Sequence, residues 1–256
     1  MHTKYQHDFP LVPSQQSKSD LEQLKELASH FENSASSLAA KIEAFPRFVT
    51  RQSLSRFISR YEVFKKVLGV PGSIIECGVF HGAGLFSFAK ISSILEPTNH
   101  SRRIIGFDTF EGFPSVHDTD KLGNSGIAYA GAFRGSSEGD IASSINFFDM
   151  NRPLSHIPKV EIVKGDLCQT AKTFVAENPH LVVSLLNLDL DLFEPTLAAL
   201  EAFVPCMPKG GVIIFDELNA KTVSGETAAV KKFFNLNSLK INRLVHDTYF
   251  SYLILE

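Results

Sequence analysis

Short apolar runs and longer amphipathic stretches alternate along most of this 256-residue chain. Six runs are rich in β-branched residues and predict strands, at 73–76, 103–107, 160–163, 181–186, 211–215 and 249–255. Several are apolar at every position, which is typical of strands buried on both faces of a parallel sheet. Helical spacing between them predicts helices at 83–95, 168–177 and 195–206. The alternation therefore predicts an α/β fold with a doubly wound, mostly parallel sheet.

The two ends of the chain depart from this alternation. A run at 239–246 precedes the last strand with no helix between them, so we expect an antiparallel C-terminal hairpin at the sheet edge. Residues 1–20 are polar and predict a flexible arm, whereas apolar spacing over 21–70 predicts a helical N-terminal extension. The main domain is then expected to cover residues 71–256.

One segment inside that domain, residues 112–158, also interrupts the alternation. It is rich in Gly, Ser, Asp and Asn, carries scattered aromatic residues, and is too long for an ordinary connection. Because it follows the second strand, it begins near the carboxyl ends of the strands. We interpret it as an inserted lid over a substrate, with a disordered insertion as the alternative.

Composition and charge narrow the classes of function. The net charge is −3, so the chain has no basic field for binding nucleic acid. The N-terminus lacks the apolar region of a signal peptide, and no apolar run reaches the ~18 residues of a membrane span. Cys77, Cys168 and Cys206 are far apart and have no metal-binding spacing. We expect a cytoplasmic protein that acts on a small molecule, without a nucleic-acid or membrane partner.

The first strand runs into a turn that contains three glycines. Its sequence is Glu76-Cys77-Gly78-Val79-Phe80-His81-Gly82-Ala83-Gly84. Gly78 and Gly82 allow the backbone to come close to a ligand, and the helix that follows offers its free N–H groups. Ligands of open α/β sheets bind beyond the carboxyl ends of the strands. The turn indicates a nucleotide-like ligand, or else only a tight strand-to-helix connection.

The second and third strands end in single aspartates. Asp108 stands where a carboxylate can accept hydrogen bonds from both hydroxyls of a ribose. Asp166 follows Gly165 after the third strand, where it can contact a ligand, cap the next helix, or do both.

The fourth and fifth strands each deliver a pair of carboxylates. Asp189 and Asp191 follow the fourth strand, and Asp216 and Glu217 follow the fifth. Neighbouring strands bring both pairs to one edge of the sheet, where carboxylates repel each other unless a cation or a proton intervenes. Such oxygen ligands suit Mg²⁺ or another hard divalent cation. The alternative is that some of the four cap helices and the others are solvated.

Together these motifs resemble the macrocin O-methyltransferase family, class I S-adenosylmethionine (SAM)-dependent enzymes that methylate antibiotic sugars. The resemblance spans about residues 73–255 and is carried most specifically by GFDTFEGFP at 106–114, LDLDLFEPT at 188–196 and GGVIIFDE at 210–217. The first turn has the E-x-G-x-x-x-G-x-G spacing of methyltransferase motif I and not the dinucleotide GxGxxG. The chain looks most similar to the branch acting on nucleotide-activated deoxysugars of enediyne natural products.

The resemblance implies a Rossmann-like fold and a set of site residues. SAM would contact Glu76, Cys77, Gly78, Val79, Phe80, Gly82, Asp108, Thr109, Phe110, Gly165, Asp166 and Asp189. Mg²⁺ would bind Asp189, Asp216 and Glu217, and Asp191 would be the general base. Many members carry Asp-Asp where this chain has Asp216-Glu217, and many have Tyr at the position of Phe193.

The implied reaction moves a methyl group from SAM to a hydroxyl of a nucleotide-activated or glycosidic deoxysugar in natural-product biosynthesis. His81 and His117 are rival sources of the base. Arg134, Arg152 or Lys121 of the lid are candidates for contacting a nucleotide diphosphate.

Two other classes of function remain open at this point. One is a non-catalytic binding or assembly protein with the SAM fold, in which the helical extension serves dimerisation. The other is an NAD-dependent sugar oxidoreductase or epimerase, which the missing GxGxxG disfavours. For the methyltransferase we expect a homodimer.

Overall fold

The computed structural model describes residues 17–122, 126 and 128–256. Within them, seven strands form one sheet in the order β3-β2-β1-β4-β5-β7-β6. The strands are β1 Ser73–Cys77, β2 Ile104–Asp108, β3 Val160–Lys164, β4 Val183–Leu188, β5 Val212–Phe215, β6 Ile241–Arg243 and β7 Ser251–Ile254. Strands β1 to β5 are parallel, and β7 runs antiparallel to both β5 and β6. The predicted doubly wound sheet with an antiparallel edge is confirmed.

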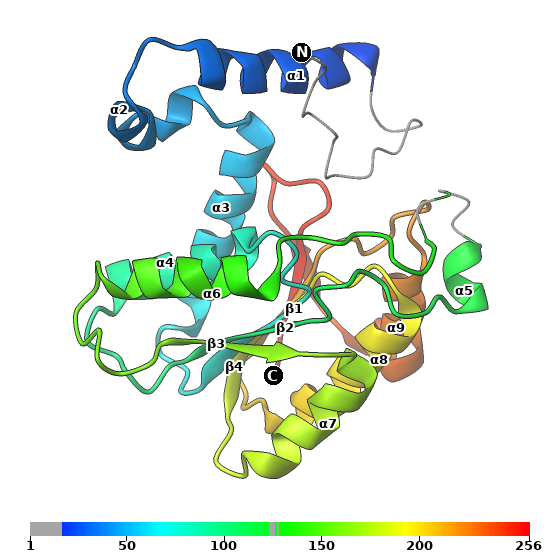
Figure 1. Cartoon of the computed structure of the whole chain (residues 1–256). Helices are drawn as coiled ribbons and strands as arrows, with labels where there is room; N and C mark the ends of the chain where they lie inside the picture. The colour runs from blue at the N-terminus through cyan, green and yellow to red at the C-terminus, as the bar shows by residue number, and fades with distance from the viewer. Residues whose placement is uncertain (1–16, 123–125, 127) are drawn as a thin grey trace.

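Helices cover both faces of the sheet (Figure 1). One layer holds α3 Arg51–Phe64, α4 Ala83–Leu95 and α6 Glu138–Asp149, and the other holds α7 Leu167–Glu177, α8 Phe193–Phe203 and α9 Gly225–Phe233. Successive strand residues point to opposite layers: Ile74 belongs to the first apolar cluster and Ile75 to the second. Both are fully buried, so the strands are apolar throughout because both faces are covered.

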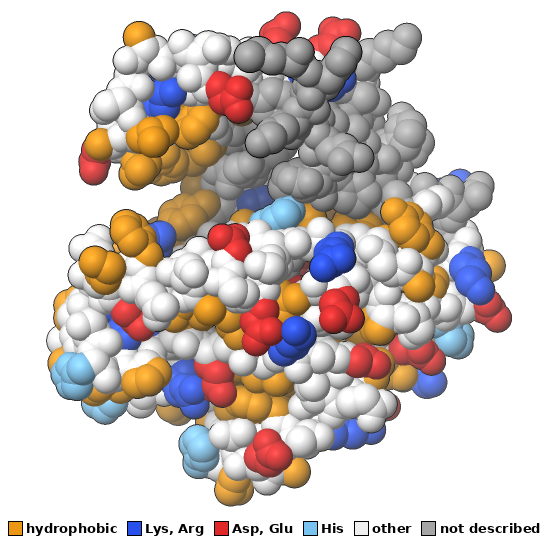
Figure 2. Space-filling view, viewed as in Figure 1, with side chains coloured by type: hydrophobic (Ala, Val, Ile, Leu, Met, Phe, Trp, Pro, Cys, Tyr) orange, Lys and Arg blue, Asp and Glu red, His pale blue; other side chains and the backbone are white. Residues whose placement is uncertain are grey.

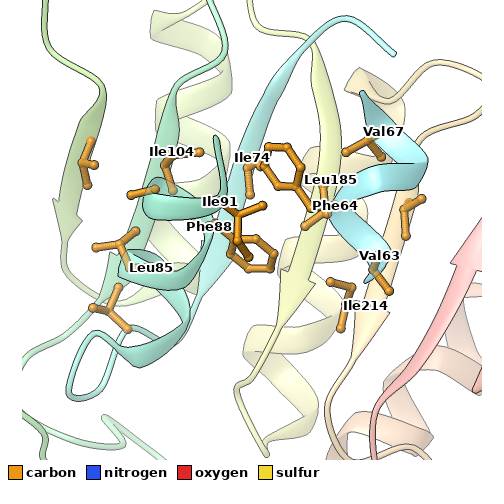
Figure 3. Close-up of a cluster of buried hydrophobic side chains, with 14 of the residues drawn as sticks. Val63, Phe64, Val67, Ile74, Leu85, Phe88, Ile91, Ile104, Leu185 and Ile214 are labelled. Atoms are coloured by element: carbon orange, nitrogen blue, oxygen red, sulfur yellow. The ribbon is translucent and has the colours of Figure 1, made fainter. Parts of the chain in front are cut away.

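The predicted helical extension divides into two parts. Helices α1 Lys18–Asn33 and α2 Leu38–Glu43 stand away from the sheet (Figure 1). Helix α3 instead buries Val63 and Phe64 completely, and Figure 3 shows Val63 near Ile214 of β5 and Phe64 on the side of α3 that faces α4. The extension is therefore not one unit, since its last helix belongs to the core of the domain. Helical spacing predicts an apolar face but not the element against which that face packs.

The predicted lid also divides, into a segment near the strand ends and a regular helix. Helix α6 places Ile141 and Phe148 in the first apolar cluster, as an ordinary crossover helix between β2 and β3 does. The part before it contains the short helix α5 Asp118–Lys121. Residues 123–125 and 127 of the lid, and residues 1–16 of the predicted arm, lie outside the described residues.

Four short 3₁₀ helices complete the described elements: η1 Phe45–Arg47, η2 Lys65–Val67, η3 Val204–Cys206 and η4 Leu236–Ser238. None of the helices in the described part of the chain is long and apolar enough to span a membrane.

Candidate active site

A cavity of about 340 Å³ lies at the carboxyl ends of the parallel strands. The strand order reverses between β1 and β4, and ligands of open α/β sheets bind at such a point. Residues following β1 to β5 line the cavity together with α3 and the aromatic side chains Phe113 and Phe133 of the lid. Its size is within the range of small-molecule sites.

Most of the residues selected from the sequence line this cavity. They are Glu76, Gly78, Val79, Phe80, Asp108, Thr109, Gly165, Asp166, Asp189, Asp191, Asp216 and Glu217. Cys77 and Phe110 do not, because their side chains are buried in the two apolar clusters. Gly82 does not line it either, since its Cα faces Phe86 and Ile141.

The glycine turn after β1 is shaped by close contacts that exclude a side chain. Gly78 has φ +93°, and a Cβ there would lie 1.9 Å from the carbonyl oxygen of Asp189. A Cβ on Gly84 would lie 2.0 Å from Glu76 Oε1. The turn thus brings β1, the start of α4 and the end of β4 into direct contact, which only glycine permits.

Asp108 organises this turn. Its Oδ2 accepts hydrogen bonds from the N–H groups of Val79 and Phe80, each at 2.8 Å, and its Oδ1 accepts one from Phe110 at 2.7 Å. A ribose would have to use the remaining lone pairs of the carboxylate. Asp166 is the N-cap of α7, where it accepts from the N–H of Cys168 at 3.0 Å.

The carboxylates predicted from the fourth and fifth strands meet at the far side of the cavity. Burial, and then the charge of Asp216, raises the pKa of Asp189 to about 8. The same two causes raise the pKa of Glu217 to about 7. Burial followed by the charge of Glu217 raises the pKa of Asp191 well above its usual value. The pKa of Asp191 and that of Glu217 each depend on the other carboxyl group, so the two groups titrate together.

Asp191 has an unusual backbone conformation, with φ +61°. It lies in a tight turn in which the N–H of Leu192 reaches the carbonyl oxygen of Leu190 at 2.6 Å. Gly225 packs under this turn, and a Cβ there would lie 2.6 Å from the Asp191 carbonyl oxygen. Such strained residues concentrate at functional sites, although the strain alone assigns no role.

Glu226 and Asp120, which belong to none of the motifs described from the sequence, hold the acidic turns in place. Glu226 is 1% exposed, and its carboxylate accepts from the N–H groups of Asp216 at 3.2 Å and Glu217 at 3.1 Å. Asp120 accepts from the N–H of Phe193, at the start of α8, at 2.8 Å. Both contacts join segments that lie far apart in the sequence or in different elements, so local patterns carry little sign of them.

Arg56 and Arg60 on α3 supply positive charge to the cavity, and the sequence analysis missed them. Arg56 forms an ion pair with Asp216 and lies 3.7 Å, from Nε to Oδ2, from Asp247. Arg60 Nη2 lies 3.9 Å from Asp189 Oδ2. The two arginines are four positions apart, so they lie on the same face of α3. This spacing is the feature of the sequence from which they could have been predicted to act together.

The lid residues considered for a diphosphate do not line the cavity. Arg152 instead pairs with Asp149 at 2.6 Å and lines a small cavity with Glu96 and Lys159. Of the rival bases, His81 does line the main cavity, with Nδ1 3.0 Å from Ser136 Oγ. His117 is the N-cap of α5.

The carboxylate cluster is chemically suited to a hard cation but is not pre-arranged around one. Among the described residues, no three His, Cys, Asp or Glu side chains stand in positions that would hold a metal ion. Arg56 takes up an oxygen of Asp216, whereas Glu217 Oε2 is buried without a hydrogen-bond partner. A cation that binds here would have to share Asp216 with Arg56 or displace it.

Comparison with known proteins assigns a family to this geometry. Residues 47–249 match the sequence model of the macrocin O-methyltransferases. The crystal structure of the calicheamicin methyltransferase CalS11 has a TM-score of 0.90 and 32% identity, over 96% of this chain and 97% of that one. An apo structure of CalS11, described as a TDP-rhamnose 3′-O-methyltransferase, has a TM-score of 0.81 and 30% identity, over 93% and 95% of the two chains.

A more distant structure shares the fold alone. The O-methyltransferase NovP has a TM-score of 0.63 and 20% identity, over 79% of this chain and 80% of that one. No curated protein sequence matches the chain. These likenesses support neither the oxidoreductase nor the non-catalytic alternative. The chain belongs to the macrocin O-methyltransferase family and is a SAM-dependent O-methyltransferase with the class I fold.

Proposed function

We propose that this enzyme methylates a hydroxyl of a deoxysugar carried by a nucleotide or a glycoside. The observation that carries the proposal is that the glycine turn after β1 and the carboxylates after β4 and β5 line the same cavity. The glycine turn lets the backbone come close to the methyl donor, and the carboxylates can accept hydrogen bonds or a proton from the hydroxyl of an acceptor. The 32% identity to a calicheamicin methyltransferase over nearly the whole chain supports a sugar as the acceptor.

The residues around the glycine turn fit SAM. Glu76 Oε2 is buried without a partner, and the ammonium group of an amino acid is a suitable donor for it. Asp108 lines the cavity and would accept the ribose hydroxyls through its remaining lone pairs, and Gly165 and Asp166 line the part of the cavity after β3. Bound SAM supplies an electrophilic methyl group. The aromatic lid residues Phe113 and Phe133, whose ring centroids are 5.1 Å apart, would exclude water from it.

Asp191 is the proposed general base. A sugar hydroxyl has a high pKa and is a poor nucleophile until a base accepts its proton. Burial and the neighbouring carboxylate of Glu217 raise the pKa of Asp191, which makes its ionised form a stronger base than an exposed aspartate. The ionised form is therefore the one that accepts the proton from the acceptor hydroxyl.

We further propose that Asp189, Asp216 and Glu217 hold Mg²⁺ or a similar cation. Burial and the charge of Asp216 raise the pKa of Asp189 and of Glu217, so a bound cation would favour their ionised forms. Carboxylate oxygens are the ligands that Mg²⁺ prefers. A bound cation would lower the pKa of the acceptor hydroxyl and orient it. Titration calorimetry should detect Mg²⁺ binding that Asp216→Asn weakens at least tenfold, and equal binding by both proteins would contradict the assignment.

A screen of nucleotide deoxysugars with SAM tests the reaction itself. Mass spectrometry should find one acceptor heavier by about 14 mass units, the mass of one added CH₂. Asp191→Asn should abolish the product while SAM binding, measured by calorimetry, is unchanged; Asp118→Asn on the lid surface is the matched control. A fully active Asp191→Asn variant would remove Asp191 from the role of base. Absence of product with every sugar would refute the acceptor class.

The exposed apolar residues of the extension support a homodimer. Leu38 is 69% exposed and Ile42 70% exposed, and Figure 2 shows hydrophobic side chains gathered on this part of the molecule. A second copy of the chain would cover them. Light scattering after gel filtration should give a dimer that Ile42→Lys converts to a monomer, whereas Glu43→Lys next to it leaves the dimer intact. A monomeric unmodified protein would refute this proposal.

A further inference from the structure

Arg60 is buried in the wall of the cavity without adequate partners. The residue is 6% exposed, and its Nε makes no hydrogen bond. Within the described residues its ion pair is with Asp189, at 3.9 Å from Nη2 to Oδ2, which is too long for a hydrogen bond. Burying a guanidinium whose Nε–H has no acceptor is unfavourable, so the position calls for an acceptor that the described residues do not supply.

Arg56, one turn earlier on α3, differs from Arg60 because it forms a side-chain hydrogen bond to a carboxylate. It forms an ion pair with Asp216 and has Asp247 within 3.7 Å of its Nε. Both arginines lie on the same face of the helix and line the same cavity. The difference in pairing makes Arg60 the one suited to a ligand anion.

Glu76, which interacts electrostatically with Arg60, has the complementary deficiency. Its Oε1 is held at the start of α4, against Gly84 and near the N–H of Leu85. Its Oε2 is buried and has no hydrogen-bond partner. The cavity wall therefore presents a guanidinium nitrogen without an acceptor together with a carboxyl oxygen without a hydrogen-bond partner.

These two deficiencies match an α-amino acid group, which carries a carboxylate and an ammonium on one carbon. With Glu76 already proposed as the partner of the ammonium group, we propose that Arg60 binds the carboxylate at the amino-acid end of SAM. Helix α3, which precedes the α/β alternation, then completes the cofactor site. The inference rests on the SAM dependence of the enzyme and not on the identity of the methyl acceptor.

Binding of three ligands by the whole protein tests the assignment. SAM carries both charged groups, decarboxylated SAM keeps the ammonium alone, and 5′-methylthioadenosine lacks both. Because a buried charge-assisted contact is at stake, the unmodified enzyme should bind SAM about 10- to 100-fold more tightly than decarboxylated SAM. Arg60→Met should abolish that preference by weakening SAM alone, and Arg60→Lys, which keeps the charge, should retain part of it.

The controls separate recognition from a structural role. Arg51→Met, an exposed arginine on the same helix, should leave all three affinities unchanged. Unchanged binding of 5′-methylthioadenosine shows that Arg60→Met is folded. If Arg60→Met weakens all three ligands equally, or if the preference for SAM survives it, the assignment is overturned. Failure to methylate sugars would leave these affinities unaffected, so the two proposals fail separately.

Discussion

Replacing Asp120 by Asn should loosen the lid from the site. Asp120 is 4% exposed; its Oδ1 accepts from the N–H of Phe193 at 2.8 Å, and its Oδ2 accepts from the N–H of His117 at 2.9 Å. The carboxylate therefore ties α5 to the first residue of α8, two positions after Asp191. An amide has one acceptor oxygen, so Asp120→Asn must leave one of the two N–H groups facing an NH₂ group.

The magnitude follows from that loss. A buried donor without its acceptor costs about 1–3 kcal/mol, and bonds to a charged acceptor lie at the upper end of this range. For a chain of this size, each kcal/mol lowers Tm by about 2–4 °C. Asp120 does not line the main cavity, so SAM affinity should change little while the rate of methyl transfer falls.

Differential scanning calorimetry and a SAM titration measure both effects. Asp118→Asn is the matched control because Asp118 lies in the same helix, with its side chain 91% exposed and paired with Lys121. Gly225→Ala should reproduce the defect, since its Cβ would lie 2.2 Å from Asp120 Oδ1. A Tm for Asp120→Asn equal to that of Asp118→Asn would refute the reasoning.

Three further predictions concern the glycine turn, Glu76 and Arg102. Gly78→Ala, whose Cβ would lie 1.9 Å from a carbonyl oxygen at φ +93°, should abolish SAM binding in calorimetry. Gly139→Ala is the control, because a Cβ at Gly139 would have nothing within 4 Å; it should stabilise the protein by up to about 1 kcal/mol in urea melts. If both variants lost SAM binding equally, steric exclusion at Gly78 would not be the cause. The second prediction concerns Glu76, whose pKa is raised by burial from 4.5 to about 8. Between pH 4.5 and 8, the folded protein therefore keeps a proton on Glu76 that the unfolded chain has lost. The free energy of unfolding, measured without SAM or divalent cations, should therefore fall as pH rises from about 4.5 to 8. Glu76→Gln should make this fall smaller. If the fall is the same in the variant, groups other than Glu76 cause it. Arg102→Met should lower the free energy of unfolding by about 3–5 kcal/mol in urea melts, because Arg102 is 3% exposed and pairs with Glu96 at 2.7 Å. Arg103→Met is the control: its ion pair with Glu161 is partly exposed, so the loss should be about 1 kcal/mol or less.

The sheet was predictable because its strands are buried on both faces. Ile74 and Ile75 point to opposite layers yet are equally buried, so the run that contains them is apolar at every position. The carboxylates Asp189 and Asp216 were predictable as neighbours for a related reason, since parallel strands end at the same edge.

Contacts between distant elements were not predictable in this way. Nothing local distinguishes α3 from α1, although only α3 buries residues such as Phe64 in the core. The same holds for Asp120 and Glu226, which bond backbone groups and not complementary side chains. Every residue except proline has a backbone N–H, so the sequence does not show which of these groups Asp120 or Glu226 will bind.

The pairing of Arg56 has a consequence for the order in which the chain acquires activity. Arg56 contacts Asp216, 160 positions later, and lies close to Asp247, which stands in the turn between β6 and β7 near the C-terminal end. During synthesis α3 leaves the ribosome long before either aspartate exists. The charge balance of the cavity is therefore complete only after α3 has met the segments that follow β5 and β6, and ligand binding reports that these distant segments have been assembled.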